Sequence, residues 1–123
     1  MEAVPRPRLF TFRNGLFRSP AFYRPAYGVF NLAAWVVAPR LGMRRTMWSG
    51  WARDWEEETT SDLIVSRALA GARPGAILLL HDSDGSPGSP DRTLAALPGI
   101  LWGLSQRRLE PVTLTSLVME PLS

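Results

Sequence analysis

Four residues of the sequence could together carry out acid–base chemistry on a bound substrate: Arg24, Asp54, Trp55 and His81. His81 is the only histidine, and an imidazole can donate or accept a proton near neutral pH. A carboxylate such as Asp54 beside it would orient the ring and favour its protonated form, which suits a general acid. The alternative is a histidine that only caps the end of a strand, and for a lone histidine this structural role is the more common.

The other residues also have structural interpretations. Trp55 could anchor a surface loop, or it could serve as a platform for a sugar ring, because its face is apolar and its edge polar. Arg24 could pair with a carboxylate for purely structural reasons. A zinc site needs more than one His or Cys, and the sequence has one His and no Cys.

Predicted strands place these residues at one rim. Strands are expected over residues 22–24, 44–49 and 76–80. The last is a continuous apolar run, typical of a parallel strand covered on both faces. Arg24 ends the first strand, the loop after the second holds Asp54, and His81 follows the third. In parallel α/β folds reactive groups gather at the carboxyl ends of strands, so we expect these side chains to come together there.

Helices are predicted between and after the strands, which makes an α/β chain with a mostly parallel sheet. The first, over residues 32–38, starts at the N-cap Asn31 and ends at Pro39. It is apolar nearly all round, which predicts burial on more than one side. The second runs from Thr60 or Ser61 to Ala70, with Gly71 as its stop.

The third helix carries leucines at spacings of three and four, at positions 94, 97, 101 and 104. Pro98-Gly99 should kink this helix or mark its true start. The Ser/Gly/Pro-rich segment before it, residues 83–90, is expected to be a mobile loop. Residues 112–117 alternate loosely and are predicted to form the last strand.

The composition fits a small folded protein, with 46% apolar residues and five Trp among 123 residues. The absence of Cys excludes disulfides and thiolate metal sites. The longest apolar stretch, residues 29–38, is too short to span a bilayer, and residues 1–6 lack the apolar run of a secretory signal. Nothing in the sequence as written is therefore expected to export or anchor the chain.

Charge is unevenly spread along the sequence. Residues 1–53 contain nine Arg and one acid, whereas residues 54–123 contain five Arg and ten acids. A basic half can indicate a surface for nucleic acid or another anionic polymer. It can equally indicate a protein divided in two, whose other half balanced the charge.

Three segments, in order and spacing over residues 22–117, resemble motifs of the polysaccharide deacetylases of the NodB-homology type. Tyr23–Gly28 (YRPAYG) resembles their Arg-Pro-Pro-Tyr-Gly motif, with Ala26 in place of the second Pro. Arg53–Trp55 resembles their Asp-Trp motif, and Gly75–Asp82 resembles their Leu-x-His motif on its strand. The resemblance implies the C-terminal portion of a distorted (β/α) barrel, with mostly parallel strands and three main helices. It implies an irregular segment over residues 1–20 and a partial deacetylase domain over residues 21–123.

The resemblance also implies an activity, the hydrolysis of N-acetyl amide bonds, which are non-peptide carbon–nitrogen bonds, in amino-sugar polymers or related amides. In such enzymes a divalent metal such as zinc activates water. The histidine that matches His81 would protonate the leaving amine, Asp54 would tune it, and Arg24 would hold the base carboxylate. The residues implied to bind substrate are Tyr27, whose N–H would help stabilise the oxyanion, and the groove-lining Trp55 and Leu79.

Two further motifs of that family, Thr-Phe-Asp-Asp-Gly and His-(Ser/Thr)-x-x-His, supply the base and the metal ligands, and neither occurs in the sequence. We therefore expect a truncated chain that is inactive in isolation, with a separate N-terminal half as one conceivable partner. The cell envelope is the compartment in which the family often works. The alternatives are a non-catalytic carbohydrate-binding or scaffold remnant, and a basic nucleic-acid-binding protein, which the resemblance disfavours.

Overall fold

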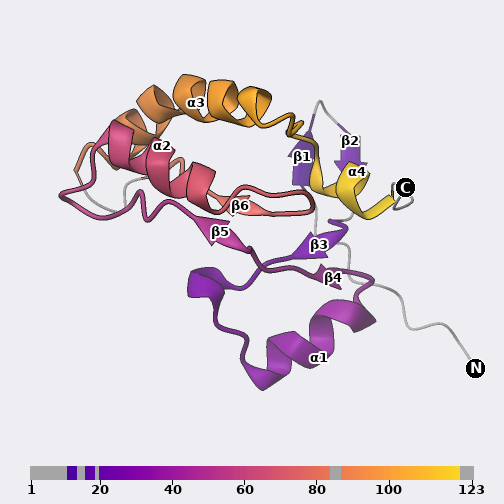
Figure 1. Ribbon diagram of the computed structural model, residues 1–123. Coiled ribbons are helices and arrows are strands. Elements are labelled where there is room, and N and C mark those ends of the chain that lie inside the picture. Colours follow the sequence, from indigo (N-terminus) through magenta and orange to yellow (C-terminus); the bar gives the residue numbers. More distant parts are fainter. Residues whose placement is uncertain (1–10, 14–15, 19, 84–86, 120–123) are drawn as a thin grey trace, which may run out of the picture. The chain divides into compact units, whose positions relative to one another are not determined.

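The computed structural model describes residues 11–13, 16–18, 20–83 and 87–119, and it divides into two compact units, residues 1–47 and 48–123 (Figure 1). Short strands alternate with helices, and the strand pairs β3–β4 and β5–β6 are parallel. The predicted α/β class with parallel strands is therefore confirmed. Within the described part of the chain, no helix has the length and apolar character needed to cross a membrane.

The first unit contains two strand pairs, a short 3₁₀ turn and one helix. Its elements are β1 (Thr11–Arg13), β2 (Leu16–Arg18), β3 (Phe22–Tyr23), η1 (Ala26–Gly28), α1 (Leu32–Arg40) and β4 (Arg44–Arg45). β1 and β2 pair antiparallel, so the described residues of segment 1–20 are extended. The remainder of that segment, apart from Pro20, lies outside the described residues. β3 forms where a strand was predicted and pairs in parallel with β4, Phe22 opposite Arg44.

Helix α1 begins as predicted, because the Asn31 side chain accepts a hydrogen bond from the Ala34 N–H at 2.7 Å. It does not stop at Pro39 but continues to Arg40. A proline lacks the N–H that would bond the carbonyl four residues earlier, here that of Trp35. The Arg45 guanidinium donates to this same carbonyl at 3.3 Å and lies over the Trp35 ring, 3.6 Å from its centroid. Arg45 thus takes over an acceptor that Pro39 leaves without its helical donor.

The prediction that α1 is buried on more than one side is wrong for this structure. Ala38 is its one buried residue, whereas Leu32 is 79% and Trp35 48% exposed. In the first unit, the described elements near α1 are very short strands, which offer little surface to pack against.

The second unit contains the other parallel pair, β5 (Gly50–Trp51) and β6 (Leu78–Leu79), with Trp51 opposite Leu79. β6 is shorter than the strand predicted over residues 76–80, and β5 lies where a loop was predicted. The strand expected over residues 44–49 is wrong as a single element, because its first two residues form β4 and the next ladder begins only at Gly50. Ser49 instead extends the pairing locally, since its side chain accepts from the Ile77 N–H at 3.0 Å and its own N–H donates to the Ile77 carbonyl at 3.0 Å.

Helix α2 (Ser61–Ala70) has the ends that the sequence predicts. The Thr60 hydroxyl accepts from the Leu63 N–H at 3.2 Å, and Gly71 follows the last turn. Figure 1 shows α2 lying beside α3 (Ser89–Gln106). Together these two helices build the core of the second unit, whose buried members are Ala52, Ile64, Ala68, Ala96, Ile100 and Leu104.

Helix α3 differs from its prediction in start and in face. It begins at Ser89, inside the segment expected to be a loop, and runs without a break through Pro98. The row of leucines is not the packing face, because Leu94 is 66% and Leu101 50% exposed and Leu104 alone of the four is buried. The packed face carries mostly small or polar residues instead, namely Ser89, Thr93, Ala96 and Gly103, together with the apolar Ile100 and Leu104. Residues 84–86 of the predicted loop lie outside the described residues.

The last predicted strand, residues 112–117, is wrong. α4 (Leu114–Met119) is a helix. Its start is fixed by Thr113, whose hydroxyl accepts from the Ser116 N–H at 3.2 Å while its carbonyl accepts from the Leu117 N–H at 3.0 Å. A threonine N-cap outweighs the weak alternation of the segment.

A close approach of Gly50 and Gly71 allows the end of α2 to meet the start of β5. A Cβ on Gly71 would lie 2.9 Å from the Gly50 Cα, which is backbone and cannot rotate away. We predict that Gly71→Ala lowers the free energy of unfolding by about 1–3 kcal/mol, as for other overpacked sites. Urea unfolding followed by circular dichroism measures it.

The control for this prediction is Ser66→Ala on the exposed side of α2, which should change stability by no more than about 0.5 kcal/mol. Equal unfolding midpoints for Gly71→Ala and the control would contradict the proposed backbone contact.

Candidate active site

Asp54 is a fully buried carboxylate, with 0% of its surface exposed, in the loop that follows β5. His81 lies just after β6, with its side chain 35% exposed. Because β5 and β6 are parallel, their carboxyl ends lie at the same edge, and the loop residue and the strand-end residue meet there. The sequence-based expectation that these two residues come together agrees with this geometry.

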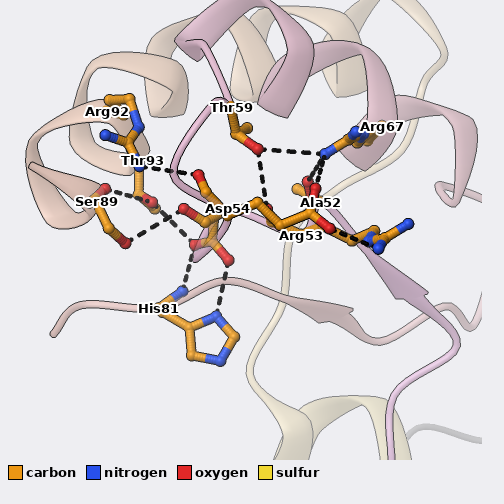
Figure 2. A network of polar contacts seen from close by, with 10 residues as sticks. Ala52, Arg53, Asp54, Thr59, Arg67, His81, Ser89, Arg92 and Thr93 are labelled. Atoms are coloured by element: carbon orange, nitrogen blue, oxygen red, sulfur yellow. Dashed lines mark hydrogen bonds and ion pairs between the residues drawn. The ribbon is translucent and has the colours of Figure 1, made fainter. Parts of the chain in front are cut away.

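The two residues make a double contact, which Figure 2 shows from close by. The His81 backbone N–H donates to Asp54 Oδ2 at 2.6 Å, and His81 Nδ1 lies 2.7 Å from Asp54 Oδ1. An ionised carboxylate can only accept, so the proton of this second bond is on Nδ1. Nε2 is then the ring nitrogen that remains able to take up or give a proton to another molecule.

Helix α3 contacts Asp54 from the other side. The Thr93 hydroxyl lies 2.9 Å from Asp54 Oδ2, and the Ser89 hydroxyl donates to the Asp54 backbone carbonyl at 3.2 Å (Figure 2). Both residues are buried. Sequence reasoning missed them, although Ser followed by Pro is a signal for a helix start that would have placed Ser89 at the first turn.

The loop before Asp54 is held in an unusual conformation. Arg53 has φ of +52°, a left-handed geometry that costs a non-glycine residue about 1 kcal/mol or more. Its carbonyl accepts from the Glu56 N–H at 3.2 Å and from the Thr59 hydroxyl at 3.3 Å. Arg67 on α2 reaches the same loop and donates to the Ala52 carbonyl at 3.3 Å. These contacts turn the chain so that the Asp54 side chain points into the unit.

Aromatic rings continue from the histidine along the same loop. The Trp55 ring meets the His81 ring edge to face, with centroids 5.3 Å apart. Trp51 lies 5.3 Å from Trp55, and Trp48 lies 6.0 Å from Trp51. Trp51 is 47% exposed. Sequence reasoning singled out Trp55 and did not foresee that Trp51 and Trp48 extend it into a row.

The other predicted site residues are Arg24, Tyr27 and Leu79. Arg24 and Tyr27 belong to the first unit, where Arg24 is exposed and Tyr27 has φ of +56° and a 99% exposed side chain. Leu79 lies on β6 and is 5% exposed. The roles of these three residues, like those of His81, Asp54 and Trp55, stay predictions.

The divalent metal that the sequence resemblance implies does not fit the residues that the structure describes. Among them, no group of three or more His, Cys, Asp or Glu side chains could hold a metal ion. The single histidine turns Nδ1 to Asp54, and both carboxylate oxygens of Asp54 already accept hydrogen bonds.

Comparison with known proteins finds relatives that are named as deacetylases. The chain is 35% identical over 100 residues to a chitooligosaccharide deacetylase of Bradyrhizobium, covering 74% of this chain and 45% of that protein. It is 34% identical over 106 residues to a peptidoglycan-N-acetylglucosamine deacetylase of Bacillus cereus, covering 82% of this chain and 46% of that protein. The chain thus spans about half the length of these relatives. No family model matches it.

Solved structures give the same result for the fold. A family 4 carbohydrate esterase from Streptomyces lividans, solved in complex with acetate, superposes with a TM-score of 0.67 at 28% sequence identity. The match covers 77% of this chain and 45% of that one. The fold is therefore that of part of a family 4 carbohydrate esterase, as the sequence motifs predicted.

Replacement of Asp54 tests the polar network directly. We predict that Asp54→Asn lowers the free energy of unfolding by about 1–3 kcal/mol, because an amide offers one acceptor oxygen where three donors converge and turns its own NH₂ toward one of them. Chemical denaturation measures the change. Asp82→Asn, an exposed carboxylate in the same segment, is the matched control and should be nearly neutral. Equal losses in the two variants would show that the Asp54 bonds do not stabilise the unit.

Proposed function

Since the chain belongs to the polysaccharide deacetylases of the NodB-homology type, we propose that it supplies the proton-donating part of a deacetylase site. It spans about half the length of the Bradyrhizobium and Bacillus cereus relatives described above. The substrate class is an N-acetylated amino-sugar polymer or a related amide. The observation that carries the proposal is the contact of His81 Nδ1 with the buried Asp54, 2.7 Å from nitrogen to oxygen, on a partly exposed imidazole.

The role of His81 follows from amide chemistry. Hydrolysis breaks the bond between the acetyl carbon and the sugar nitrogen, and that nitrogen is a poor leaving group until it gains a proton. With Nδ1–H directed at Asp54, the proton on Nε2 of the charged ring is the one that can move to the leaving nitrogen. The negative charge of Asp54 stabilises the ring while it carries two protons, and the product is a free amine and acetate.

Further residues have supporting roles in this proposal. Trp55, whose ring touches His81, would bind a sugar face, and Leu79 would lie against the acetyl group. Arg24 would hold the carboxylate that acts as base, and the Tyr27 N–H would stabilise the oxyanion. The positive φ of Tyr27 supports its role, because such a turn directs a backbone N–H outward from the regular structure.

Water activation needs groups that the sequence does not contain, since it lacks the motifs Thr-Phe-Asp-Asp-Gly and His-(Ser/Thr)-x-x-His. In the proposal these groups come from a second polypeptide segment, and the chain without it does not release acetate. Because one of the relatives is named for peptidoglycan, a polymer of the cell wall, the proposed place of action is the cell envelope.

A second candidate function is carbohydrate binding without catalysis. The row Trp48, Trp51 and Trp55 favours it, because a tryptophan face can bind a sugar ring and Trp51 in the middle of the row is 47% exposed. Such binding needs no second segment. Binding of chitooligosaccharides by the chain, without acetate release in any assembly that contains the missing motifs, would identify this function.

A chimera tests the proposal. The part of the Bacillus cereus relative that this chain does not match is fused to the N-terminus of this chain. Acetate release from N-acetylated chitooligosaccharides is then measured with zinc supplied. We predict release by the chimera and none by the chain itself. His81→Gln in the chimera should lower kcat about 100-fold or more, the usual contribution of a general acid.

The matched control is Asp82→Asn in the same chimera, which removes a charge beside His81 on an exposed side chain and should keep kcat within about twofold. Acetate release that is insensitive to His81→Gln would overturn the proposed role. A folded chimera that binds the oligosaccharides but releases no acetate would favour the second candidate.

A further inference from the structure

We propose that Thr93 is a positioning residue of this site, whose hydroxyl holds the Asp54 carboxylate in the orientation that presents Oδ1 to His81 Nδ1. The inference deepens the proposed function and rests on it for the catalytic meaning of the ring. The juxtaposition itself stands on the described contacts of α3, the Asp54 loop and the residue after β6 (Figure 2).

The orientation of a carboxylate is not set by its own torsion, because rotation about the bond to a planar group is only weakly restricted. Its neighbours must fix it. Asp54 Oδ2 lies within hydrogen-bond distance of two donors, the His81 backbone N–H at 2.6 Å and the Thr93 hydroxyl at 2.9 Å. These donors come from different parts of the chain, the segment just after β6 and the first turns of α3. Because both donors hold Oδ2, the other carboxylate oxygen, Oδ1, faces the imidazole.

The Thr93 hydroxyl has one proton and two acceptors within reach. One is Asp54 Oδ2 at 2.9 Å, and the other is the Ser89 carbonyl at 3.1 Å, four residues earlier in the helix. A helical threonine with only a structural role would bond that carbonyl. The carboxylate is nearer and carries charge, and hydrogen bonds to ionised acceptors are roughly twice as strong as neutral ones. The proton is therefore directed to Asp54.

The same turn of α3 also holds the main chain of Asp54. The Ser89 hydroxyl donates to the Asp54 carbonyl at 3.2 Å, so side chain and backbone are tied to one helical segment. That segment is anchored in the core within the next two turns, through Ala96 and Ile100. Thr93 is 6% exposed and Asp54 0%, so bulk water competes little for these bonds. The position of the helix thus sets the position of the carboxylate.

Loss of the Thr93 hydroxyl should change the properties of the His81 imidazole indirectly, through Asp54. With one fewer donor on Oδ2, the carboxylate can rotate and its bond to Nδ1–H weakens. The neutral ring then divides between its two tautomers, and the Nδ1 proton exchanges with water more rapidly. A threonine that only stabilises the helix would leave both properties of the ring unchanged.

The experiment compares the ¹⁵N-labelled chain with Thr93→Val, which keeps the side-chain shape, and Thr93→Ser, which keeps the hydroxyl. Long-range ¹H–¹⁵N correlation reads the tautomer at alkaline pH, and the single histidine gives one set of signals. We expect the Nδ1–H form in the parent chain and in Thr93→Ser. In Thr93→Val we expect a tautomer mixture and an Nδ1–H exchange at least about tenfold faster, the size expected for losing a bond to a charged group.

A parent-like tautomer and exchange rate in folded Thr93→Val would overturn the inference. If Thr93→Val does not fold, the test is the Thr93 hydroxyl proton of the parent chain. A hydroxyl proton held by a buried carboxylate must be visible in the NMR spectrum and slow to exchange. An unobservable Thr93 hydroxyl proton would then overturn it.

Different results would overturn the proposed function and the positioning role of Thr93. In the chimera, Thr93→Val should lower kcat about tenfold with KM nearly unchanged, and Thr93→Ser should restore it. A chimera without acetate release, together with an intact tautomer effect in the chain, would overturn the proposed function and leave the positioning role of Thr93 standing. Release that is insensitive to Thr93→Val would overturn the catalytic part of the inference.

Discussion

The burial of the Asp54 carboxylate is the constraint on which the second unit depends. A carboxylate with no exposed surface must be fully hydrogen-bonded, because leaving a charged group unsatisfied in the interior costs several kcal/mol. Its partners come from places far apart in the sequence, the backbone and ring of His81 and the hydroxyl of Thr93. The end of β6, the loop after β5 and the first turns of α3 must therefore meet at one point, and the same meeting makes the candidate site.

The surrounding structure offsets what this geometry costs. The left-handed backbone of Arg53 is strained, and its carbonyl is held by Glu56 and Thr59 while Arg67 ties the neighbouring Ala52 carbonyl to α2. Small residues let the helices come close enough for these bonds to form. A Cβ on Gly103 would lie well within contact distance of the Leu69 side chain, so only glycine fits there without movement of the leucine. Packing and polar contacts thus support the same arrangement.

The first unit shows a different balance between polar and apolar contacts. Its order rests on local pairs, such as Arg45 on Trp35 and the contacts of Phe30 with Tyr23 and Trp35, while much of α1 stays exposed. Arg24 and Tyr27, the predicted residues of this unit, lie on its surface. A chain that spans about half the length of its relatives is expected to expose surface that a full-length relative covers. The exposed apolar side chains of α1 agree with that expectation.

The sequence by itself determined the features that depend on neighbouring residues. The caps Asn31, Thr60 and Gly71 were predictable because a cap acts within one turn. The order of the motifs was enough to identify the family and to pair Asp54 with His81 as a hypothesis. Tertiary structure decided the rest. It packed a face of α3 that leaves Leu94 and Leu101 exposed, and it brought Thr93 and Ser89 to Asp54. These outcomes depend on which surfaces meet in space, and contacts between residues more than 30 positions apart leave no mark in local periodicity.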